Sequence, residues 1–153
     1  ARDYGVKQSN KSSKYLLFLD ADDLICNTYL ECAYLTLKMH PNASWTYTDT
    51  INFDGQEFLW RKWYSVKKEM EDNLLVMTAL INKDDFLEVK GFDIDWKNLY
   101  EDWYLWLKLI EKGKFPVRMS FLGFWYRKKA AEESELSRAN NKNRRKRHKA
   151  RPR

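Results

Sequence analysis

The sequence predicts an α/β fold in which a mixed sheet is flanked by helices. Apolar runs rich in aromatic and β-branched residues alternate with stretches of helical periodicity, as in layered α/β folds. The clearest strand is the apolar run at residues 14–19 (KYLLFL), because it ends abruptly in acids. The clearest helix is at residues 100–112, where apolar residues recur at helical spacing: Trp103, Trp106, Leu107 and Ile110.

The other elements follow from local signals. Thr28 precedes Glu31 by three residues, the spacing of a capping box, and Pro41 stops the helix that begins there. Asp54–Gly55 is typical of a hairpin turn between aromatic strands. We expect strands at residues 14–19, 45–53, 58–60 and 74–81, a strand pair at 115–126 around Gly123, and helices at 2–8, 28–39, 83–89 and 100–112.

The chain length predicts one domain, because 153 residues can bury one core and are too few for two. The sequence opens inside the predicted helix at residues 2–8, with no strand before it from which that helix would cross over. We therefore expect a sheet that is incomplete at its N-terminal side. The predicted organisation is a domain at residues 1–137 and a tail at residues 138–153.

The composition, 44% apolar and 33% charged, is that of a globular protein. The uncharged stretch at residues 73–82 is far shorter than the roughly 20 residues of a membrane helix. Cys26 and Cys32 are too few for a disulfide framework and fit a reducing compartment. These observations predict a cytoplasmic protein.

The basic charge is concentrated in the tail. Nine of the 28 Lys and Arg residues lie at 138–153, so 19 basic and 22 acidic residues leave residues 1–137 with a charge of about −3. We expect this tail to be unstructured. It could bind phosphate backbones without sequence specificity, or an anionic membrane surface at the cytoplasmic face. No specific nucleic-acid partner is expected.

Asp20, Asp22 and Asp23 crowd the end of the first predicted strand. Neighbouring carboxylates repel one another, and a bound cation relieves that repulsion. Ligands with oxygen atoms only indicate Mg²⁺ or Mn²⁺, which usually complete their coordination with substrate phosphates. The alternative is a solvated acidic turn that precedes the next helix.

Glu101 and Asp102 lie in the first turn of the predicted helix at residues 100–112. Acids are favoured there by the helix dipole, so the pair can serve simply as a cap. The functional alternative is a general base, because a carboxylate beside Tyr100 and Trp103 would be partly desolvated and would hold its proton more tightly.

Weaker candidates have equally ordinary alternatives. Arg2 could bind a phosphate in bidentate fashion or be solvated. Thr48 and Asp49, which we place at the end of a strand, could face a cleft or belong to a turn. Five aromatic residues could stack on sugar rings or be core residues: Trp60, Trp63, Tyr64, Trp125 and Tyr126.

Together these segments resemble the inverting glycosyltransferases of family 2, which have the Rossmann-like GT-A fold. Residues 1–5 (ARDYG) are similar to the family's A-R-N-x-G segment, and residues 14–24 (KYLLFLDADDL) to its strand and DxD motif. Residues 78–81 and Gly91–Phe92–Asp93 resemble the acceptor-side strand and the G-G-F/Y-D turn. Tyr100–Glu101–Asp102–Trp103 resembles the E-D motif. The four motifs occur in the family's order, and the resemblance covers residues 1–138.

The resemblance implies a metal-dependent transferase that moves a sugar from a nucleotide-sugar donor to an acceptor hydroxyl. Asp20 would lie at the ribose or metal side of the nucleotide, and Asp22 would bind Mn²⁺ or Mg²⁺. Arg2 would lie beside the diphosphate. Asp102 would be the base that deprotonates the acceptor, with Glu101 in support.

The acceptor would be the hydroxyl of a glycan, a lipid-linked molecule or a protein. Residues assigned to its side of the site are Thr48, Asp49, Gly91, Phe92 and Trp103.

By the resemblance, the family's first strands, which bind the nucleotide base, would lie upstream of residue 1, and residues 1–137 would be the C-terminal part of a GT-A domain. The sequence also departs from the family at three places. Asp3 stands where the family has Asn, and Lys90 where it usually has Gly. No Q-x-x-R-W loop follows the E-D helix, so Arg127, Arg138 or neither takes its contact with the diphosphate. Two other interpretations stay open: a non-catalytic remnant of the fold, and a module that binds nucleic acid through its basic tail.

Overall fold

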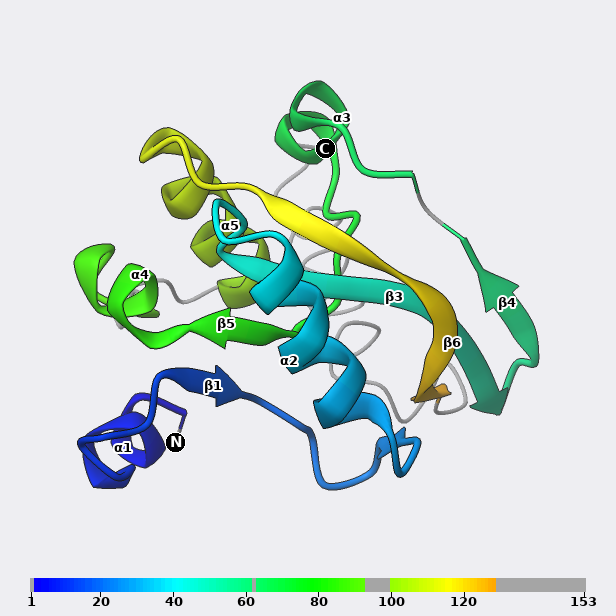
Figure 1. Ribbon diagram of the computed structural model, residues 1–153. Helices are drawn as coiled ribbons and strands as arrows, with labels where there is room; N and C mark the ends of the chain where they lie inside the picture. Colours follow the sequence, from blue (N-terminus) through cyan, green and yellow to red (C-terminus); the bar gives the residue numbers. More distant parts are fainter. Residues whose placement is uncertain (1, 62, 93–99, 129–153) are drawn as a thin grey trace, which may run out of the picture.

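A curled mixed sheet runs through the centre of the protein (Figure 1). This computed structural model describes residues 2–61, 63–92 and 100–128. Its sheet has six strands in the order β1-β5-β3-β6-β2, and β4 pairs with β3 beside this path. The strands are β1 (Tyr15–Leu17), β2 (Leu24–Ile25), β3 (Trp45–Asp54), β4 (Phe58–Trp60), β5 (Leu80–Asn82) and β6 (Pro116–Lys128). The predicted α/β class is confirmed.

The long strands β3 and β6 are the only parallel pair within the described residues, with Trp45 beside Pro116 at one end and Asp54 beside Lys128 at the other. The pairing shifts twice between Tyr47 and Thr50, where β6 contributes extra residues. Near this irregularity the Gly123 carbonyl accepts a hydrogen bond from the Cys26 amide at 3.0 Å. A Cβ at Gly123 would lie 2.4 Å from the Phe121 ring, so any larger residue would force that ring to move.

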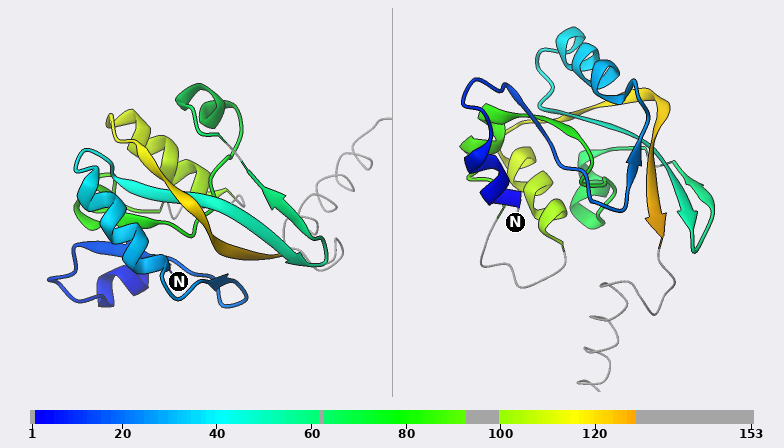
Figure 2. Two further views of the ribbon diagram at one scale, coloured as in Figure 1. Left: turned by 45° about the vertical axis from the view of Figure 1, so that its right-hand side comes forward. Right: turned by 90° about the horizontal axis from the view of Figure 1, so that it is seen from below.

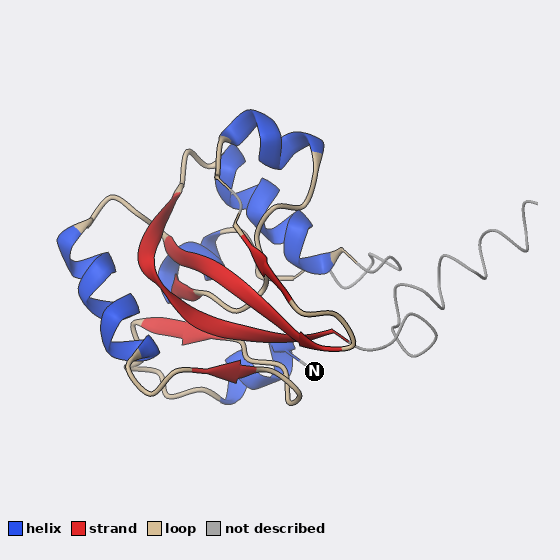
Figure 3. Ribbon diagram, turned by 90° about the vertical axis from the view of Figure 1, so that its right-hand side faces the viewer, coloured by secondary structure: helices blue, strands red, loops and turns tan. Residues whose placement is uncertain are grey.

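Helices cover both faces of the sheet (Figures 2 and 3). They are α1 (Arg2–Gln8), α2 (Tyr29–Met39), α3 (Val66–Glu71), α4 (Lys83–Glu88) and α5 (Glu101–Glu111). Helix α2 lies on one face, and α1, α4 and α5 lie on the other. None of the helices in the described ranges has the length and apolar character needed to cross a bilayer.

The sheet separates two hydrophobic clusters because successive strand residues point to opposite faces. In β3, Trp45 and Tyr47 join the cluster beneath α5, whereas in β5 Leu80 joins the cluster beneath α2 and Ile81 the one beneath α5. The indole rings of Trp45 and Trp106 stack, with centroids 5.1 Å apart and planes 12° from parallel. Both rings are fully buried, so this stack joins α5 to the centre of the sheet.

Most predicted elements are present within two or three residues of their expected bounds, but two strand predictions were wrong. Residues 74–79 bend at Leu75 and Met77 and pack mostly into the cluster beneath α5, and only Leu80–Asn82 pairs with neighbouring strands. The expected strand pair at 115–126 is one continuous strand, Pro116–Lys128, because Gly123 accommodates a close contact there and makes no turn.

Local details of the helices also differ from expectation. The capping box at Thr28 does not form; the Thr28 hydroxyl lies 3.5 Å from Cys26 Sγ instead. In α5 the buried residues are Leu105, Trp106 and Leu109, whereas Trp103, Leu107 and Ile110 are only half-buried. Two short elements, α3 and β2, carry no clear signal in the sequence. The tail at residues 138–153 lies outside the described residues.

The stacked indoles predict which tryptophan supports the fold. Trp106→Ala should destabilise the protein by about 3–5 kcal/mol, because it removes a fully buried ring and leaves a cavity against Trp45. Chemical denaturation followed by fluorescence or circular dichroism measures this change.

Trp63→Ala is the matched control. Its ring is 70% exposed and contacts the Arg118 guanidinium, so its loss should cost no more than about 1 kcal/mol. Equal losses in the two variants would contradict this assignment of the core.

Candidate functional site

The Arg2 guanidinium joins the two acidic motifs that the sequence singles out. Its Nη2 lies 2.6 Å from Asp20 Oδ1, and its Nη1 lies 2.6 Å from Glu101 Oε1. These residues come from α1, the turn after β1 and the first turn of α5. The Arg2 side chain is 26% exposed, against 48% for Asp20 and 43% for Glu101. The tertiary structure therefore brings together Arg2, Asp20 and Glu101.

Asp102 lies beside this ion-pair cluster but has different partners. Its Oδ1 accepts hydrogen bonds from Asn73 Nδ2 at 3.1 Å and from the Trp103 amide at 2.8 Å. Burial raises the pKa of Asp102, and these two hydrogen bonds oppose that effect. The neighbouring Glu101 charge raises the pKa further, and the Arg2 charge lowers it. Asp102 is thus a desolvated carboxylate of the kind that a general base requires.

Asp22 and Asp23 are anchored to β6 by Arg127. The Asp23 carboxylate accepts the Arg127 amide at 2.9 Å, and the Asp22 carbonyl accepts Arg127 Nε at 3.0 Å. Burial raises the pKa of Asp23 to about 6, and the charges of Asp20 and Asp22 add to this effect. Arg127 Nη1 contacts Asp54 at 2.8 Å. Asp23 and Arg127 therefore support the acidic turn, while Arg138, the other candidate for the diphosphate contact, lies outside the described residues.

The turn after α4 contains Lys90 and contacts Asp3, two residues that the sequence analysis singled out. Lys90 and Gly91 both have φ of 61°, the left-handed conformation that glycine adopts without strain. Lys90 thus has a backbone conformation that a glycine would take without strain. The Phe92 amide donates to Asp3 Oδ1 at 3.3 Å, a contact that an Asn oxygen could also accept. Asp93 lies outside the described residues.

Thr48 and Asp49 lie in the middle of β3 and make contacts within the sheet. The Thr48 hydroxyl donates to the Phe121 carbonyl. Asp49 Oδ2 lies 2.6 Å from Arg118 Nη2 and 3.5 Å from Arg61 Nε. The expectation that these two residues end a strand was wrong, because β3 continues to Asp54. The partners of Thr48 and Asp49 described above are not carboxylates of the two acidic motifs.

Trp103 and the aromatic candidates are dispersed. Trp103 Nε1 donates to the Glu69 carbonyl at 2.6 Å and joins α5 to α3, so this nitrogen has a structural partner. Tyr64 packs against the cluster beneath α5, and Tyr126 against the one beneath α2. The five aromatic residues therefore do not form one platform.

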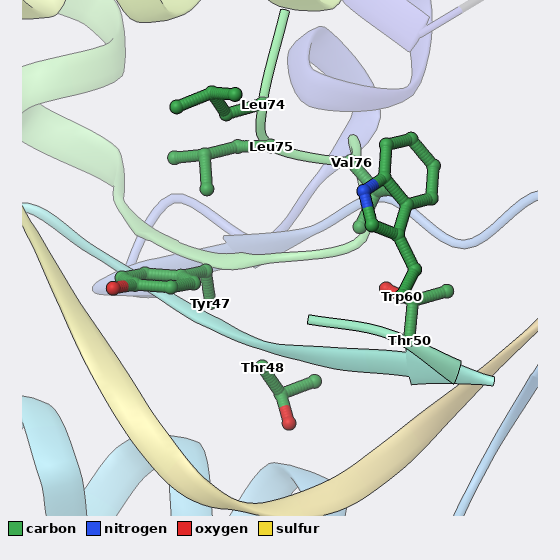
Figure 4. Close-up of a pocket in the computed structure, with 7 residues that line it drawn as sticks. All are labelled: Tyr47, Thr48, Thr50, Trp60, Leu74, Leu75 and Val76. Carbon is green, nitrogen blue, oxygen red and sulfur yellow. The ribbon is translucent and has the colours of Figure 1, made fainter. Parts of the chain in front are cut away.

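A small pocket lies between β3, β4 and the segment before β5 (Figure 4). Its lining residues are Tyr47, Thr48, Thr50, Trp60, Leu74, Leu75 and Val76. None of the predicted acids lines it. Candidate chemistry is therefore located on the surface around Arg2, outside this pocket.

The described residues include no group of three His, Cys, Asp or Glu side chains placed to hold a metal ion by themselves. Asp20 contacts Arg2, and Asp23 contacts the Arg127 backbone, so these two carboxylates have different partners. The donor set around Asp20 and Asp22 still fits Mg²⁺ or Mn²⁺ in kind, because such ions often take one or two carboxylates and fill their remaining positions with phosphate and water.

The sequence analysis did not identify Asn73 as a partner of Asp102, nor Lys108 as a residue that binds the turn after α4. Lys108 Nζ donates to the carbonyls of Val89 and Gly91. Neither residue lies in a motif. Every residue has a backbone carbonyl, so the sequence does not indicate which carbonyls a lysine will bind.

Solved structures that resemble this chain include two of S. aureus TarS. The crystal structure of TarS 1–349 in complex with UDP-GlcNAc has a TM-score of 0.65 and 17% sequence identity, and the match covers 90% of this chain and 40% of that chain. A second structure, TarS 1–349, has a TM-score of 0.62 and 17% identity, and the match covers 86% of this chain and 40% of that chain. No protein-family model and no curated protein sequence matches the chain.

These likenesses define the class of fold. The chain has a glycosyltransferase-like α/β fold, with a mixed sheet between layers of helices. It spans 40% of the TarS chain, and at 17% identity the likeness concerns the fold alone.

The turn at Gly91 provides a test of how the site is built. Gly91→Ala should destabilise the protein, because φ is +61° and the added Cβ would lie 2.8 Å from the Phe86 ring and 2.9 Å from Asp3 Oδ1. The left-handed backbone costs about 1–2 kcal/mol and the collision about 1–3 kcal/mol more. Denaturant unfolding measures the sum.

Gly113→Ala separates the two effects. Its φ is +71°, but nothing lies within 4 Å of an added Cβ, so only the backbone cost applies. If both variants lose the same stability, the close contact among Gly91, Phe86 and Asp3 is not as described.

Proposed function

We propose that this chain is a metal-dependent inverting glycosyltransferase, or part of one, that transfers a sugar from a nucleotide-sugar donor to an acceptor hydroxyl. One observation carries the proposal. Arg2 binds Asp20 of the DxD-like turn and Glu101 of the E-D motif at 2.6 Å each. The acids that we assign to the donor side and to the acceptor side are thereby adjacent in a fold like that of TarS.

The donor is proposed to bind at the Arg2 and Asp20 side. TarS was crystallised with UDP-GlcNAc, which supports a nucleotide sugar as the class of donor. A guanidinium has five N–H donors, so the ion pairs of Arg2 with two carboxylates do not exhaust its capacity for a diphosphate.

Asp22, with Asp20, would hold the divalent cation. When bound, Mn²⁺ or Mg²⁺ would act as a Lewis acid toward the departing nucleoside diphosphate. Arg127 orients the segment by binding the Asp22 carbonyl and offering its amide to Asp23. The Asp22 carboxylate is thus carried on a backbone that is fixed at two points.

Asp102 is proposed as the general base. It would take the proton of the acceptor hydroxyl while that oxygen attacks the anomeric carbon and the bond to the diphosphate breaks, which inverts the configuration. Adjacent residues of a helix diverge by about 100°, so Glu101 and Asp102 cannot both face one hydroxyl. The contact between Glu101 and Arg2 favours Asp102 for this role.

The cation assignment predicts a ligand-dependent rise in melting temperature. Mn²⁺ with UDP should stabilise the wild type, since a ligand that binds only the folded state shifts unfolding to higher temperature. Asp22→Asn should lose most of that rise, because it removes the carboxylate proposed to hold the ion. Thermal unfolding with each ligand alone and with both measures the effect.

Asp84→Asn is the control, since Asp84 is an exposed acid in the first turn of α4. It should keep the full rise. A wild-type rise that survives unchanged in Asp22→Asn would remove the metal assignment.

The base assignment predicts unequal losses of activity in the E-D pair. Asp102→Asn should lower turnover by roughly 10²–10⁴-fold, the usual contribution of a positioned general base. Glu101→Gln should cost less. Donor hydrolysis or transfer with UDP-GlcNAc and Mn²⁺ provides the assay, and binding of UDP should survive both changes.

The pH profile gives an independent check. A base must be deprotonated, and burial raises the pKa of Asp102, so activity should fall on acidification at a higher pH than for an ordinary aspartate. Full activity in Asp102→Asn with loss in Glu101→Gln would reverse the assignment.

A non-catalytic remnant is the competing proposal, and it predicts no turnover and no response to Mn²⁺ and UDP. The nature of the acceptor, a cytoplasmic location and an association of residues 138–153 with an anionic membrane remain predictions from the sequence.

A further inference from the structure

Arg2 binds the Glu101 carboxylate directly, whereas Asp102 accepts its hydrogen bonds from other groups. The guanidinium is planar, and its Nη1 and Nη2 bind Glu101 and Asp20 at 2.6 Å each. A rigid planar group that binds two carboxylates also sets the distance between them. The guanidinium carbon lies 5.9 Å from the centroid of the Phe92 ring, in the turn that leads toward α5. Arg2 is therefore held among three segments that are distant in the sequence.

Asp102 receives its direct hydrogen bonds from neutral groups, the Asn73 amide and the Trp103 backbone. Three titratable or charged groups on the elements around it interact with its charge: Arg2 on α1, Glu101 on α5 and Tyr126 on β6. Because Glu101 faces Arg2, the first turn of α5 is fixed in rotation, and the next residue is directed toward Asn73.

We propose that Arg2 is a positioning residue for the base: by binding Asp20 and Glu101 together, it joins the acidic turn after β1 to the first turn of α5 and orients Asp102 toward Asn73. This role is distinct from a contact with the donor. It rests on the proposed function only in treating Asp102 as the base, and the contacts themselves require no substrate.

The test is a carboxyl titration of Asp102 by ¹³C NMR in the full chain, without ligands. Arg2→Gln removes a positive charge, so the titration of Asp102 should move to higher pH. Glu101→Gln removes a negative charge, so it should move to lower pH. Arg2→Lys keeps the charge but cannot bind two carboxylates in a fixed plane. The titration of Asp102 in this variant should therefore stay closer to that in the wild type.

A second measurement reports orientation. Hydrogen exchange of the Asn73 side-chain amide should accelerate in both Arg2→Lys and Arg2→Gln, because its bond to Asp102 Oδ1 depends on the rotation of the first turn. Lys114→Gln is the matched control: Lys114 also contacts two carboxylates, Asp85 at 2.6 Å and Glu88 at 3.3 Å. This variant should change neither readout.

Titrations that shift in the same direction, or do not shift, in Arg2→Gln and Glu101→Gln would overturn the proposal. Unchanged Asn73 exchange in Arg2→Lys would overturn it as well, and that variant serves if Arg2→Gln does not fold. The proposed function fails separately: opposite titration shifts in a protein that has no turnover would leave Arg2 as a positioning residue in a non-catalytic fold.

Discussion

The parallel pairing of β3 with β6 is the constraint on which the rest of this structure depends. It extends from Trp45 beside Pro116 to Asp54 beside Lys128, and it separates the two hydrophobic clusters. At one end the stacked indoles of Trp45 and Trp106 join α5 to the sheet. Toward the other end β6 pairs with β2 and, through Arg127, binds the acidic turn. Both acidic motifs are thus positioned by one pair of strands.

The charges of the candidate site are arranged around two arginines. Arg2 binds the side chains of Asp20 and Glu101. Arg127 instead donates from its side-chain Nε to the Asp22 carbonyl and from its backbone amide to the Asp23 carboxylate. Paired carboxylates remain ionised more easily than buried ones that lack a cation, because the opposite charge offsets the cost of desolvation. Asp102 has no cation within its direct hydrogen bonds, and burial raises its pKa. Neighbouring acids therefore acquire different chemistry from different surroundings.

The segments around the candidate site are held largely by side chains that donate hydrogen bonds to backbone carbonyls. Lys108 binds the carbonyls of Val89 and Gly91, and Trp103 binds the carbonyl of Glu69. Such contacts hold the turn after α4 and the helix α3 in place, and they do not depend on the side chains of the residues that accept the hydrogen bonds. Lys90 in this turn has a left-handed backbone although it is not a glycine.

The sequence by itself determined the order of most elements, because strand and helix periodicities and turn residues act locally. It also identified Arg2, Asp20, Glu101 and Asp102 as candidates, since acids after an apolar strand or in the first turn of a helix are visible as patterns. It could not tell that residues 74–79 lack a strand partner, because a buried apolar segment that bends has the same composition as a buried strand.

Only the tertiary structure decided the partners of the candidate acids. Three of these findings are contacts between segments far apart in the chain. Arg2 contacts both acidic motifs, Asn73 binds Asp102, and Thr48 and Asp49 bind Phe121 and Arg118 of β6. Hydrogen bonds and ion pairs act over about 3 Å, so they depend on the folded position of each atom and leave no periodicity in the sequence.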